Sequence, residues 1–209
     1  MNFIKTKDGS YTLYNEQYRE HYHSISGAYE EAREKHVNAL DLKNGFKILD
    51  FCFGLGYNSF AAVEKYSNLE IIALEKDIEV LEKIKKLTNS PYLSKQFQHF
   101  AEIAEKGEIK DNKNNTIKII IDNVFNSLPK LPSLYFDRVF FDPFSPKKQP
   151  ELWCKQIFEH IYKILKFKGQ LSTYSCAKQV RTNLKDVGFR VKDGPIVGRR
   201  SPATIAIKE

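Results

Sequence analysis

Cysteine is scarce in this 209-residue sequence: Cys52, Cys154 and Cys176 are the only three, and they lie far apart. The sequence contains no CxxC pair and no cluster of Cys and His at metal-ligand spacing, which argues against a zinc site. An odd number of widely spaced cysteines is typical of reduced thiols that pack as small apolar side chains. We therefore expect no bound metal.

Long apolar segments are also lacking. No stretch approaches the roughly 20 apolar residues that a membrane-spanning helix needs, and residues 1–7 lack the apolar segment of a secretory signal. These absences predict a cytoplasmic protein without a membrane partner.

Acidic residues are the minority among the charged ones. Lys and Arg number 33 against 26 Asp and Glu, a net charge of +7. Such an excess attracts polyanions and is typical of proteins that bind RNA or DNA. Because genome composition also produces lysine-rich chains, the charge alone does not identify the partner.

The length fits one domain with a small N-terminal extension. Residues 1–42 are predicted as the extension: a hairpin over 3–14 around an Asp8-Gly9 turn, then a mostly helical stretch over 15–42 with a break at Ser26-Gly27. Residues 43–209 are predicted as the main domain.

Within residues 43–209, short apolar runs alternate with helical patterns. Strands are expected at 47–51, 69–74, 117–121, 138–141 and 170–174, and helices at 58–65, 77–87, 152–165 and 177–187. This alternation predicts an α/β fold with a mostly parallel sheet, which residues 189–191 and 204–207 extend as an antiparallel C-terminal hairpin. The hairpin is typical of class I, Rossmann-like methyltransferases, although periodicity alone does not separate them from other doubly wound folds.

Acids and glycines follow the predicted strands at their carboxyl ends, where doubly wound sheets bind ligands. In chain order they are Asp50, Gly54 and Gly56, then Glu75, Asp122 and Asp142. Glycine lets the backbone approach a ligand, and Glu75 can accept both hydroxyls of a ribose. Asp122 is expected to accept an adenine amino hydrogen and Asp50 to face an ammonium group. Together these residues predict a site for S-adenosylmethionine.

Each of these residues also has a simpler interpretation. Two glycines suit a tight strand-to-helix turn, and Glu75 or Asp122 suits a solvated loop. Ser59 occupies the third glycine position of a GxGxxG motif, which disfavours a dehydrogenase. The occurrence of all four acids in order favours the methyl donor.

The segment after the fourth predicted strand is the most distinctive of the chain. Residues 140–153 read FFDPFSPKKQPELW, with an acid and an aromatic residue on a loop stiffened by three prolines. Asp142 is predicted to be catalytic: it would accept a hydrogen bond from an acceptor amine, orient its lone pair or remove its proton. Methyl transfer is an in-line displacement, so positioning matters more than acid–base strength. Trp153 is expected to pack in the core.

The chain resembles, over nearly its whole length, the methyltransferase domain of MnmC-type enzymes, the tRNA 5-methylaminomethyl-2-thiouridine methyltransferases. The loop segment of this family is matched by Asp142, Phe144, Pro146, Lys148, Pro150 and Trp153, and its cofactor loop by Asp50, Phe53, Gly54, Gly56 and Asn58. Residues 6–13, 22–28, 173–177 and 180–189 are similar to further family segments.

The resemblance implies methylation of the aminomethyl amine on a wobble uridine of tRNA, with S-adenosylmethionine as cofactor. It implies a cofactor site made of Asp50, Phe53, Gly54, Gly56, Asn58, Glu75, Asp122 and Asp142. It implies contacts of the tRNA anticodon loop with Lys147, Lys148, Arg181, Arg199 and Arg200, and a substrate entrance lined by Phe144, Tyr22 and His23. A solvated surface is the alternative for the basic residues, and a structural role is the alternative for His23.

Two features depart from the family. Cys52 replaces the first glycine of the cofactor loop and is expected to reshape that turn. Because the sequence ends at Glu209, we expect the FAD-dependent oxidase half of the fused enzymes to be absent and the protein to be a stand-alone methyltransferase. Whether a separate oxidase or another upstream enzyme supplies the substrate stays open.

Two alternatives also stay open. One is another class I transferase acting on a small amine, either an N-methyltransferase or an aminopropyltransferase of the spermidine synthase type. The other is a non-enzymatic RNA-binding protein with a Rossmann fold, which only Cys52 favours. The remaining histidines, His21, His36, His99 and His160, form no pattern and are expected at the surface or in the core.

Overall fold

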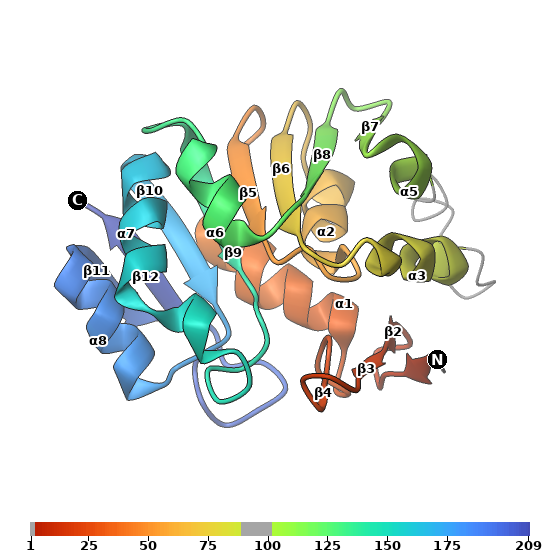
Figure 1. The fold of residues 1–209 in the computed structure, drawn as a ribbon, viewed down its shortest axis with the longest axis horizontal. Coiled ribbons are helices and arrows are strands. Elements are labelled where there is room, and N and C mark those ends of the chain that lie inside the picture. Colours follow the sequence, from red (N-terminus) through yellow and green to blue (C-terminus); the bar gives the residue numbers. More distant parts are fainter. Residues whose placement is uncertain (1–2, 89–101) are drawn as a thin grey trace.

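The computed structural model describes residues 3–88 and 102–209, so His99 lies outside the described residues. An eight-stranded sheet runs through the molecule in the order β11-β12-β10-β9-β5-β6-β8-β7 (Figure 1). Its parallel part consists of β10 (Leu165–Thr173), β9 (Phe136–Phe141), β5 (Lys47–Phe51), β6 (Glu70–Glu75) and β8 (Thr116–Ile121). The predicted α/β fold with a mostly parallel sheet is confirmed.

Antiparallel strands form both edges of the sheet. At one edge β12 (Thr204–Lys208) pairs with β10, and β11 (Phe189–Asp193) pairs with β12, which confirms the predicted C-terminal hairpin. At the other edge β7 (Glu108–Lys110) pairs with β8. A strand of three residues with one apolar side chain is too short to show alternation, so the sequence does not predict it.

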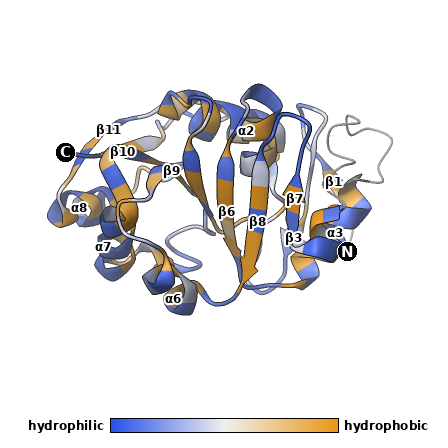
Figure 2. Cartoon of the chain, turned by 90° about the horizontal axis from the view of Figure 1, so that it is seen from above, coloured by the Kyte–Doolittle hydropathy of each residue, from blue (hydrophilic) through white to orange (hydrophobic). Residues whose placement is uncertain are grey.

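Each face of the sheet has its own core, because successive strand residues point to opposite faces. On β5, Ile48 packs in one core and Leu49 in the other. Helices of the first core are α1 (Ala28–Glu31), η1 (Ala32–Val37), η2 (Asn38–Leu40), α2 (Tyr57–Lys65), α3 (Glu79–Thr88) and α5 (Ile103–Lys106). Helices of the second are α6 (Val124–Ser127), η4 (Leu128–Lys130), η5 (Pro150–Trp153), α7 (Lys155–Ile164) and α8 (Lys178–Val187). Figure 2 shows hydrophobic residues along β6, as expected for a strand covered on both faces.

The N-terminal segment contains two small hairpins. The predicted one pairs β1 (Ile4–Lys5) with β2 (Tyr11–Thr12), and a second pairs β3 (Tyr14–Asn15) with β4 (Glu20–His21). The helical prediction over 15–42 is therefore wrong up to residue 27, whereas residues 28–40 are helical. Tyr14, Tyr18 and Tyr22 recur every four residues, a spacing that also occurs on one face of a helix. In the structure, Tyr18 and Tyr22 instead contact Phe144 of a distant loop.

The C-terminus and the first described residues lie at opposite ends of the molecule (Figures 1 and 2). Over residues 3–88 and 102–209, no helix combines the length and the hydropathy needed to cross a membrane. The same residues include no group of three or more His, Cys, Asp or Glu side chains arranged to hold a metal ion.

Candidate active site

Two clefts open at the carboxyl ends of the parallel strands. The first cleft holds about 930 Å³ and the second about 770 Å³ of empty space, including space open to solvent. The first cleft is lined by residues that include Tyr18, Cys52, Gly54, Leu74, Glu75, Asp77, Asn123, Val124 and Phe125. The second is lined by residues that include Glu20, His23, Glu31, Lys35, Tyr174, Val197, Gly198 and Arg199. Both linings contain Tyr22, Asp142, Pro143 and Phe144, so the two clefts meet at these residues.

Glu75 ends β6 in the first cleft, and backbone groups hold its carboxylate. Oε2 accepts a hydrogen bond from the Gly54 amide at 3.0 Å, and Oε1 accepts from the amides of Lys76 at 2.8 Å and Asp77 at 3.0 Å. Burial raises the pKa of Glu75 above its usual range. Both lone pairs of Oε1 are thus engaged by backbone amides, whereas Oε2 keeps one lone pair for a hydroxyl donor such as that of a ribose.

The loop after β5 contains three left-handed residues, Cys52 (φ 66°), Gly54 (φ 55°) and Gly56 (φ 81°). Gly54 lines the first cleft, where its missing side chain leaves room for a ligand. At Gly56, a Cβ atom would lie 2.5 Å from Cζ of Phe60 and 2.8 Å from Cζ of Phe53. Gly56 is therefore required by core packing, whereas Gly54 shapes the cleft.

Cys52 occupies a position where glycine is conformationally favoured. A non-glycine residue in the left-handed region costs about 1–2 kcal/mol. The Cys52 side chain lines the first cleft, and burial raises the pKa of its thiol well above the usual range. The turn forms despite the substitution, at the cost of backbone strain.

Three residues predicted to bind the cofactor lie beneath the first cleft or beside it. Phe53 is buried and packs edge-on against Phe60, with ring centroids 5.8 Å apart. Asp50 is fully buried and its Oδ2 accepts a hydrogen bond from Oγ of Ser59 at 2.6 Å. Burial raises the pKa of Asp50 to about 8. The third residue, Asn58, contacts Asp142 and is described with it below.

After β8, the residues that line the first cleft are Asn123, Val124 and Phe125. Asp122 is not among the described residues that line it. Oδ1 of Asp122 accepts hydrogen bonds from the Asn123 amide at 2.7 Å and from Nδ2 of Asn126 at 3.1 Å. The contact that Asp122 is expected to make with adenine stays a prediction; Asn123 and Phe125, from the next residues, line the first cleft. The strand end predicts the location of this contact but not which of its successive side chains points inward.

Asp142 lies where the clefts meet. Its Oδ2 accepts a hydrogen bond from Nδ2 of Asn58 at 3.0 Å. The Asp142 side chain is only 10% exposed, and burial raises its pKa to about 6. Such a carboxylate is mostly ionised at neutral pH and can accept a proton from a bound ligand.

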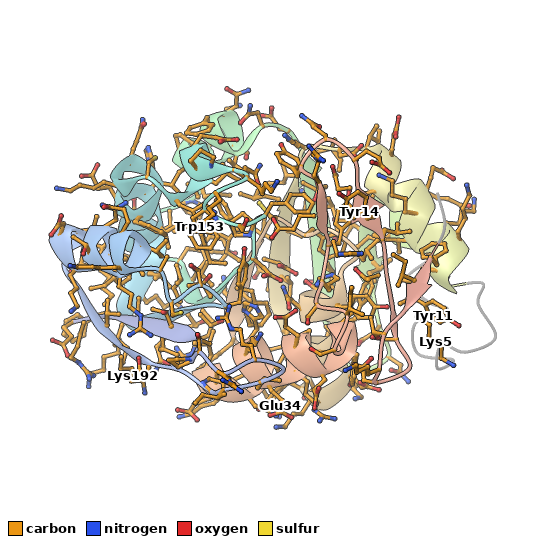
Figure 3. All side chains as sticks on the ribbon, turned by 90° about the horizontal axis from the view of Figure 1, so that it is seen from below. Lys5, Tyr11, Tyr14, Glu34, Trp153 and Lys192 are labelled. Atoms are coloured by element: carbon orange, nitrogen blue, oxygen red, sulfur yellow. The ribbon has the colours of Figure 1, made fainter. Side chains whose placement is uncertain are left out.

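The loop that carries Asp142 is held from three directions. The Trp153 indole donates to the Phe144 carbonyl at 2.8 Å, and the Tyr174 hydroxyl donates to the Pro143 carbonyl at 3.0 Å. The Ser145 amide donates to Oε2 of Glu20 at 2.9 Å. Trp153 is 3% exposed and lies among inner side chains, whereas Glu34 and Lys192 lie at the periphery (Figure 3). The prediction that Trp153 packs in the core is confirmed.

Aromatic residues of the N-terminal hairpins cover this loop. The Tyr18 ring stacks on Phe144 with centroids 4.6 Å apart, and the Tyr22 ring meets Phe144 edge-on at 5.2 Å. Tyr22 and Phe144 line both clefts, while Tyr18 lines the first. The N-terminal segment therefore forms one wall of the site.

Buried charges line the second cleft. Glu31 forms an ion pair with Lys35, and its Oε2 accepts from the Ser24 amide at 3.0 Å. His23 packs edge-on against Tyr57, and no described residue offers its Nε2 a hydrogen bond. Burial lowers the pKa of His23, so its imidazole is neutral. The second cleft thus combines carboxylates with the cations Lys35 and Arg199 and with uncharged polar groups.

The predicted basic substrate residues fall into two groups. Arg199 lines the second cleft, and its guanidinium carbon lies 5.7 Å from the centre of the Tyr174 ring. Arg200 is its exposed neighbour, and Lys147 and Lys148 are exposed on the loop that carries Asp142. These four residues lie in the loops that border the second cleft.

Arg181 differs from the other four basic residues. Its Nη1 forms an ion pair with Oδ1 of Asp193 at 2.6 Å, and its Nε donates to Oγ1 of Thr204 at 2.9 Å. The guanidinium thereby joins α8 to the C-terminal hairpin. Its donors are engaged within the chain, which does not suit the expected phosphate contact.

Sequence patterns miss several residues at the clefts. Tyr18, Glu20, Glu31 and Lys35 come from segments without a recognisable motif and precede the first predicted strand of the main domain. The only sequence signal available for them is the unusual density of tyrosine and acid in residues 14–35.

Known proteins that are similar to this chain include methyltransferases of the same fold. The family model for S-adenosyl-L-methionine-dependent methyltransferases matches residues 83–209. The crystal structure of MNMC2 from Aquifex aeolicus superposes with a TM-score of 0.79 at 30% identity, covering 98% of this chain and 69% of that chain. Spermidine synthase from Thermotoga maritima, with a TM-score of 0.61 at 20% identity over 97% of this chain and 64% of that one, shares the fold.

Two relatives extend the comparison at the sequence level. An uncharacterized protein of Methanocaldococcus jannaschii is 33% identical over 98% of this chain and 59% of its own length. The tRNA 5-methylaminomethyl-2-thiouridine biosynthesis bifunctional protein MnmC of Campylobacter fetus is 29% identical over 86% of this chain and 32% of its own length. The chain thus spans less than two thirds of either relative. The aminopropyltransferase and non-enzymatic alternatives are not favoured: the chain belongs to the S-adenosyl-L-methionine-dependent methyltransferase family, as a methyltransferase domain of the MnmC type.

Proposed function

We propose that this methyltransferase transfers a methyl group to the primary amine of an aminomethyl group on the wobble uridine of tRNA. The observation that carries the proposal is the position of Asp142, whose buried carboxylate lies where the two clefts meet. A methyl donor in the first cleft and an amine in the second would both reach this residue. The biosynthetic role in the name of the MnmC relative supplies the substrate class.

The residues of the first cleft fit S-adenosylmethionine. Oε2 of Glu75 offers its remaining lone pair to a ribose hydroxyl, and Gly54 leaves the adjacent backbone uncovered. Phe125, which is 40% exposed, and Leu74 provide apolar surface for adenine, and Asn123 provides an amide for its polar edge. The apolar lining with a few fixed polar groups is typical of cofactor pockets.

The second cleft suits a basic amine attached to a planar ring. Glu20 and Asp142 give the lining carboxylate groups that attract an ammonium ion, whereas Glu31 is paired with Lys35. Phe144 and Tyr174 give it aromatic surface on which a nucleobase can stack. A uridine that is turned out of the anticodon loop combines these two features in one group.

For methyl transfer, the protein needs mainly to position the amine and the methyl donor and to remove a proton from the amine. S-adenosylmethionine supplies, when bound, a methyl group on a positively charged sulfur. Asp142 accepts the proton that the ammonium form of the substrate must lose, and then directs the neutral nitrogen by a hydrogen bond. Phe144 and Tyr22 cover the meeting point of the clefts and exclude water from it.

Exposed cations support an RNA partner. Lys147, Lys148 and Arg200 are exposed on loops that border the second cleft, and the half-buried Arg199 lines it; all four would contact phosphates on both sides of the flipped nucleotide. A tRNA substrate implies a reaction in the cytoplasm, after an upstream enzyme, such as a separate oxidase, has produced the aminomethyl group.

The test uses purified protein, S-adenosylmethionine labelled in its methyl group, and tRNA from cells that lack this methylation, so that its wobble uridine carries the unmethylated aminomethyl group. After incubation, the tRNA is digested and the nucleosides are separated. Label in a methylaminomethyl uridine is the expected result. Cofactor binding without label in any nucleoside would overturn the tRNA substrate and leave the methyltransferase assignment intact. Unmodified tRNA without the aminomethyl group is the matched control.

A further inference from the structure

A buried histidine lies behind Asp142 on the side away from the clefts. His36 is fully buried, and its Nε2 lies 3.8 Å from Oδ2 of Asp142. Its Nδ1 is 2.8 Å from Oγ of Ser172, which belongs to β10. No described residue forms a hydrogen bond with Nε2. One imidazole nitrogen is thus held by a hydroxyl, and the other faces the carboxylate.

The helix that carries His36 is irregular at this position. Residues Ala32–Val37 form a π-helix between α1 and η2. The wider turn buries the consecutive residues Lys35, His36 and Val37, whereas a regular amphipathic helix would send one of three successive side chains outward. Single π-helical turns are frequent at functional sites. Here the turn allows Lys35 to line the second cleft and His36 to reach Asp142.

The protonation of His36 follows from its surroundings. Burial lowers the pKa of His36 to about 3, so the ring is neutral and carries one proton. When the Ser172 hydroxyl donates to Nδ1, that proton is on Nε2 and points to the carboxylate. The opposite tautomer would direct a lone pair at an ionised carboxylate, which is repulsive.

We propose that His36, oriented by Ser172, is a positioning residue for Asp142: its Nε2–H stabilises the ionised carboxylate and holds its free oxygen toward the amine. The proposal rests on the function proposed above for Asp142. Asn58 donates to the same oxygen of Asp142 from the other side of the site at 3.0 Å. The separation of 3.8 Å from His36 is longer than a hydrogen bond, and such contacts often shorten when the ligand is bound.

Other charged and titratable groups face Asp142 and define the background of any pH effect. They are His23, between β4 and α1, Glu31 of α1, Lys35 of η1, Asp50 of β5 and Tyr174 after β10. Burial and Glu31 raise the pKa of Asp142, while the Asn58 amide and Lys35 lower it. Because all of these remain when His36 alone is replaced, a change in Asp142 titration reports on the imidazole.

Three variants separate positioning from packing. His36→Phe keeps an aromatic ring in place and removes the N–H, and His36→Gln restores an N–H at the position of Nε2. Ser172→Ala leaves the ring but removes the group that selects its tautomer. His160→Phe, on α7 and away from both clefts, is the control for loss of a histidine.

The first readout is the carboxyl ¹³C NMR titration of Asp142 in the protein without tRNA, with Asp142→Asn used to assign the signal. We expect His36→Phe to raise the titration midpoint by about one pH unit, the usual size of the effect when one stabilising interaction is removed from a buried carboxylate. His36→Gln should restore most of the shift, Ser172→Ala should shift it in the same direction by less, and His160→Phe should leave it unchanged.

The second readout is the pH dependence of kcat for methyl transfer. Its acid limb should move upward by the same amount in His36→Phe, with KM for S-adenosylmethionine unchanged. An unmoved midpoint in His36→Phe and in Ser172→Ala would overturn the proposal, and Ser172→Ala alone decides it if His36→Phe does not fold. A shifted midpoint in a protein that transfers no methyl group to tRNA would instead count against the proposed function.

Discussion

Asn58 donates a hydrogen bond from its Nδ2 to Oδ2 of Asp142 over 3.0 Å. Asn58 is the second residue of α2, which begins directly after the left-handed Gly56, and Asp142 follows β9. The bond therefore joins the loop that borders the first cleft to the carboxylate at the junction with the second. The hydrogen bond thus connects α2 to the carboxylate that lines both clefts.

Replacement of Asp142 by asparagine should reduce kcat for methyl transfer by about 10²–10⁴-fold, the range for loss of a positioned proton acceptor. The substitution keeps the volume of the side chain, so we expect the thermal midpoint and the affinity for S-adenosylmethionine to change little. The pKa of about 6 predicts that wild-type activity falls as the pH drops below 6. Single-turnover kinetics with matched cofactor titrations measure both effects, and unchanged turnover would remove Asp142 from the mechanism.

The two glycines of the cofactor loop should respond differently to substitution by alanine. Gly56→Ala places a Cβ 2.5 Å from Phe60 at a positive φ, and we expect a loss of about 2–4 kcal/mol in unfolding free energy. Gly54→Ala meets no atom closer than 3.4 Å; it should cost about 1–2 kcal/mol in stability and weaken cofactor binding more than Gly56→Ala does in the folded fraction. Urea denaturation and calorimetric titration distinguish them, and equal effects on binding would contradict this division of roles.

Asp50 should make the protein less stable at high pH. Its folded-state pKa of about 8 lies above the unfolded value, so the folded state binds the proton more tightly and this contribution to stability is lost as the pH rises from about 4 to about 8. Asp50→Asn removes the ionisation and keeps the hydrogen bond from Ser59, so it should stabilise the protein by about 1–3 kcal/mol at pH 8 and by little at pH 4. Unfolding curves at the two pH values provide the test; equal effects at both would mean that Asp50 does not titrate in this range.

Cys52 should be a site where glycine improves stability. The residue has a φ of 66°, and Cys52→Gly relieves a strain of about 1 kcal/mol, less the entropy that glycine adds to the unfolded chain. Cys52→Ala is the matched control, since it removes the thiol but keeps the strained backbone. The thermal midpoint should rise in the first variant and not in the second. A rise in both would point to the thiol rather than to the backbone.

The paired substitution Arg199→Ala with Arg200→Ala should weaken tRNA binding and reduce the slope of log K against log salt by about 1–2, one unit for each phosphate that is no longer neutralised. Arg181→Ala is the control, because its guanidinium binds Asp193 and Thr204. It should lower the stability of the protein and leave the salt slope unchanged. An unaltered slope in the double variant would place both arginines outside the interface.

The parallel strands and the longer helices of residues 43–209 were predictable because their signals are local. Apolar runs such as Ile117 to Ile121 and the helical stripe that contains Phe158 and Ile161 report burial through the alternation of neighbouring residues. The N-terminal segment shows the limit of such signals. Its pattern over residues 15–42 predicts a mostly helical stretch, but Tyr18 and Tyr22 contact Phe144, more than 100 residues away in the chain, and local periodicity carries no information about such a partner.

By itself, the sequence determined the order of strands and helices, the place of acids and glycines at strand ends, and the resemblance that the comparisons bear out. Only the tertiary structure decided which side chains meet: Asn123 rather than Asp122 in the first cleft, Asn58 on Asp142, and His36 behind it. The physical reason is that secondary structure follows from interactions within a few residues. A site, in contrast, depends on side-chain directions and on contacts between β5, β9, η1 and α2, which become neighbours only when the sheet forms.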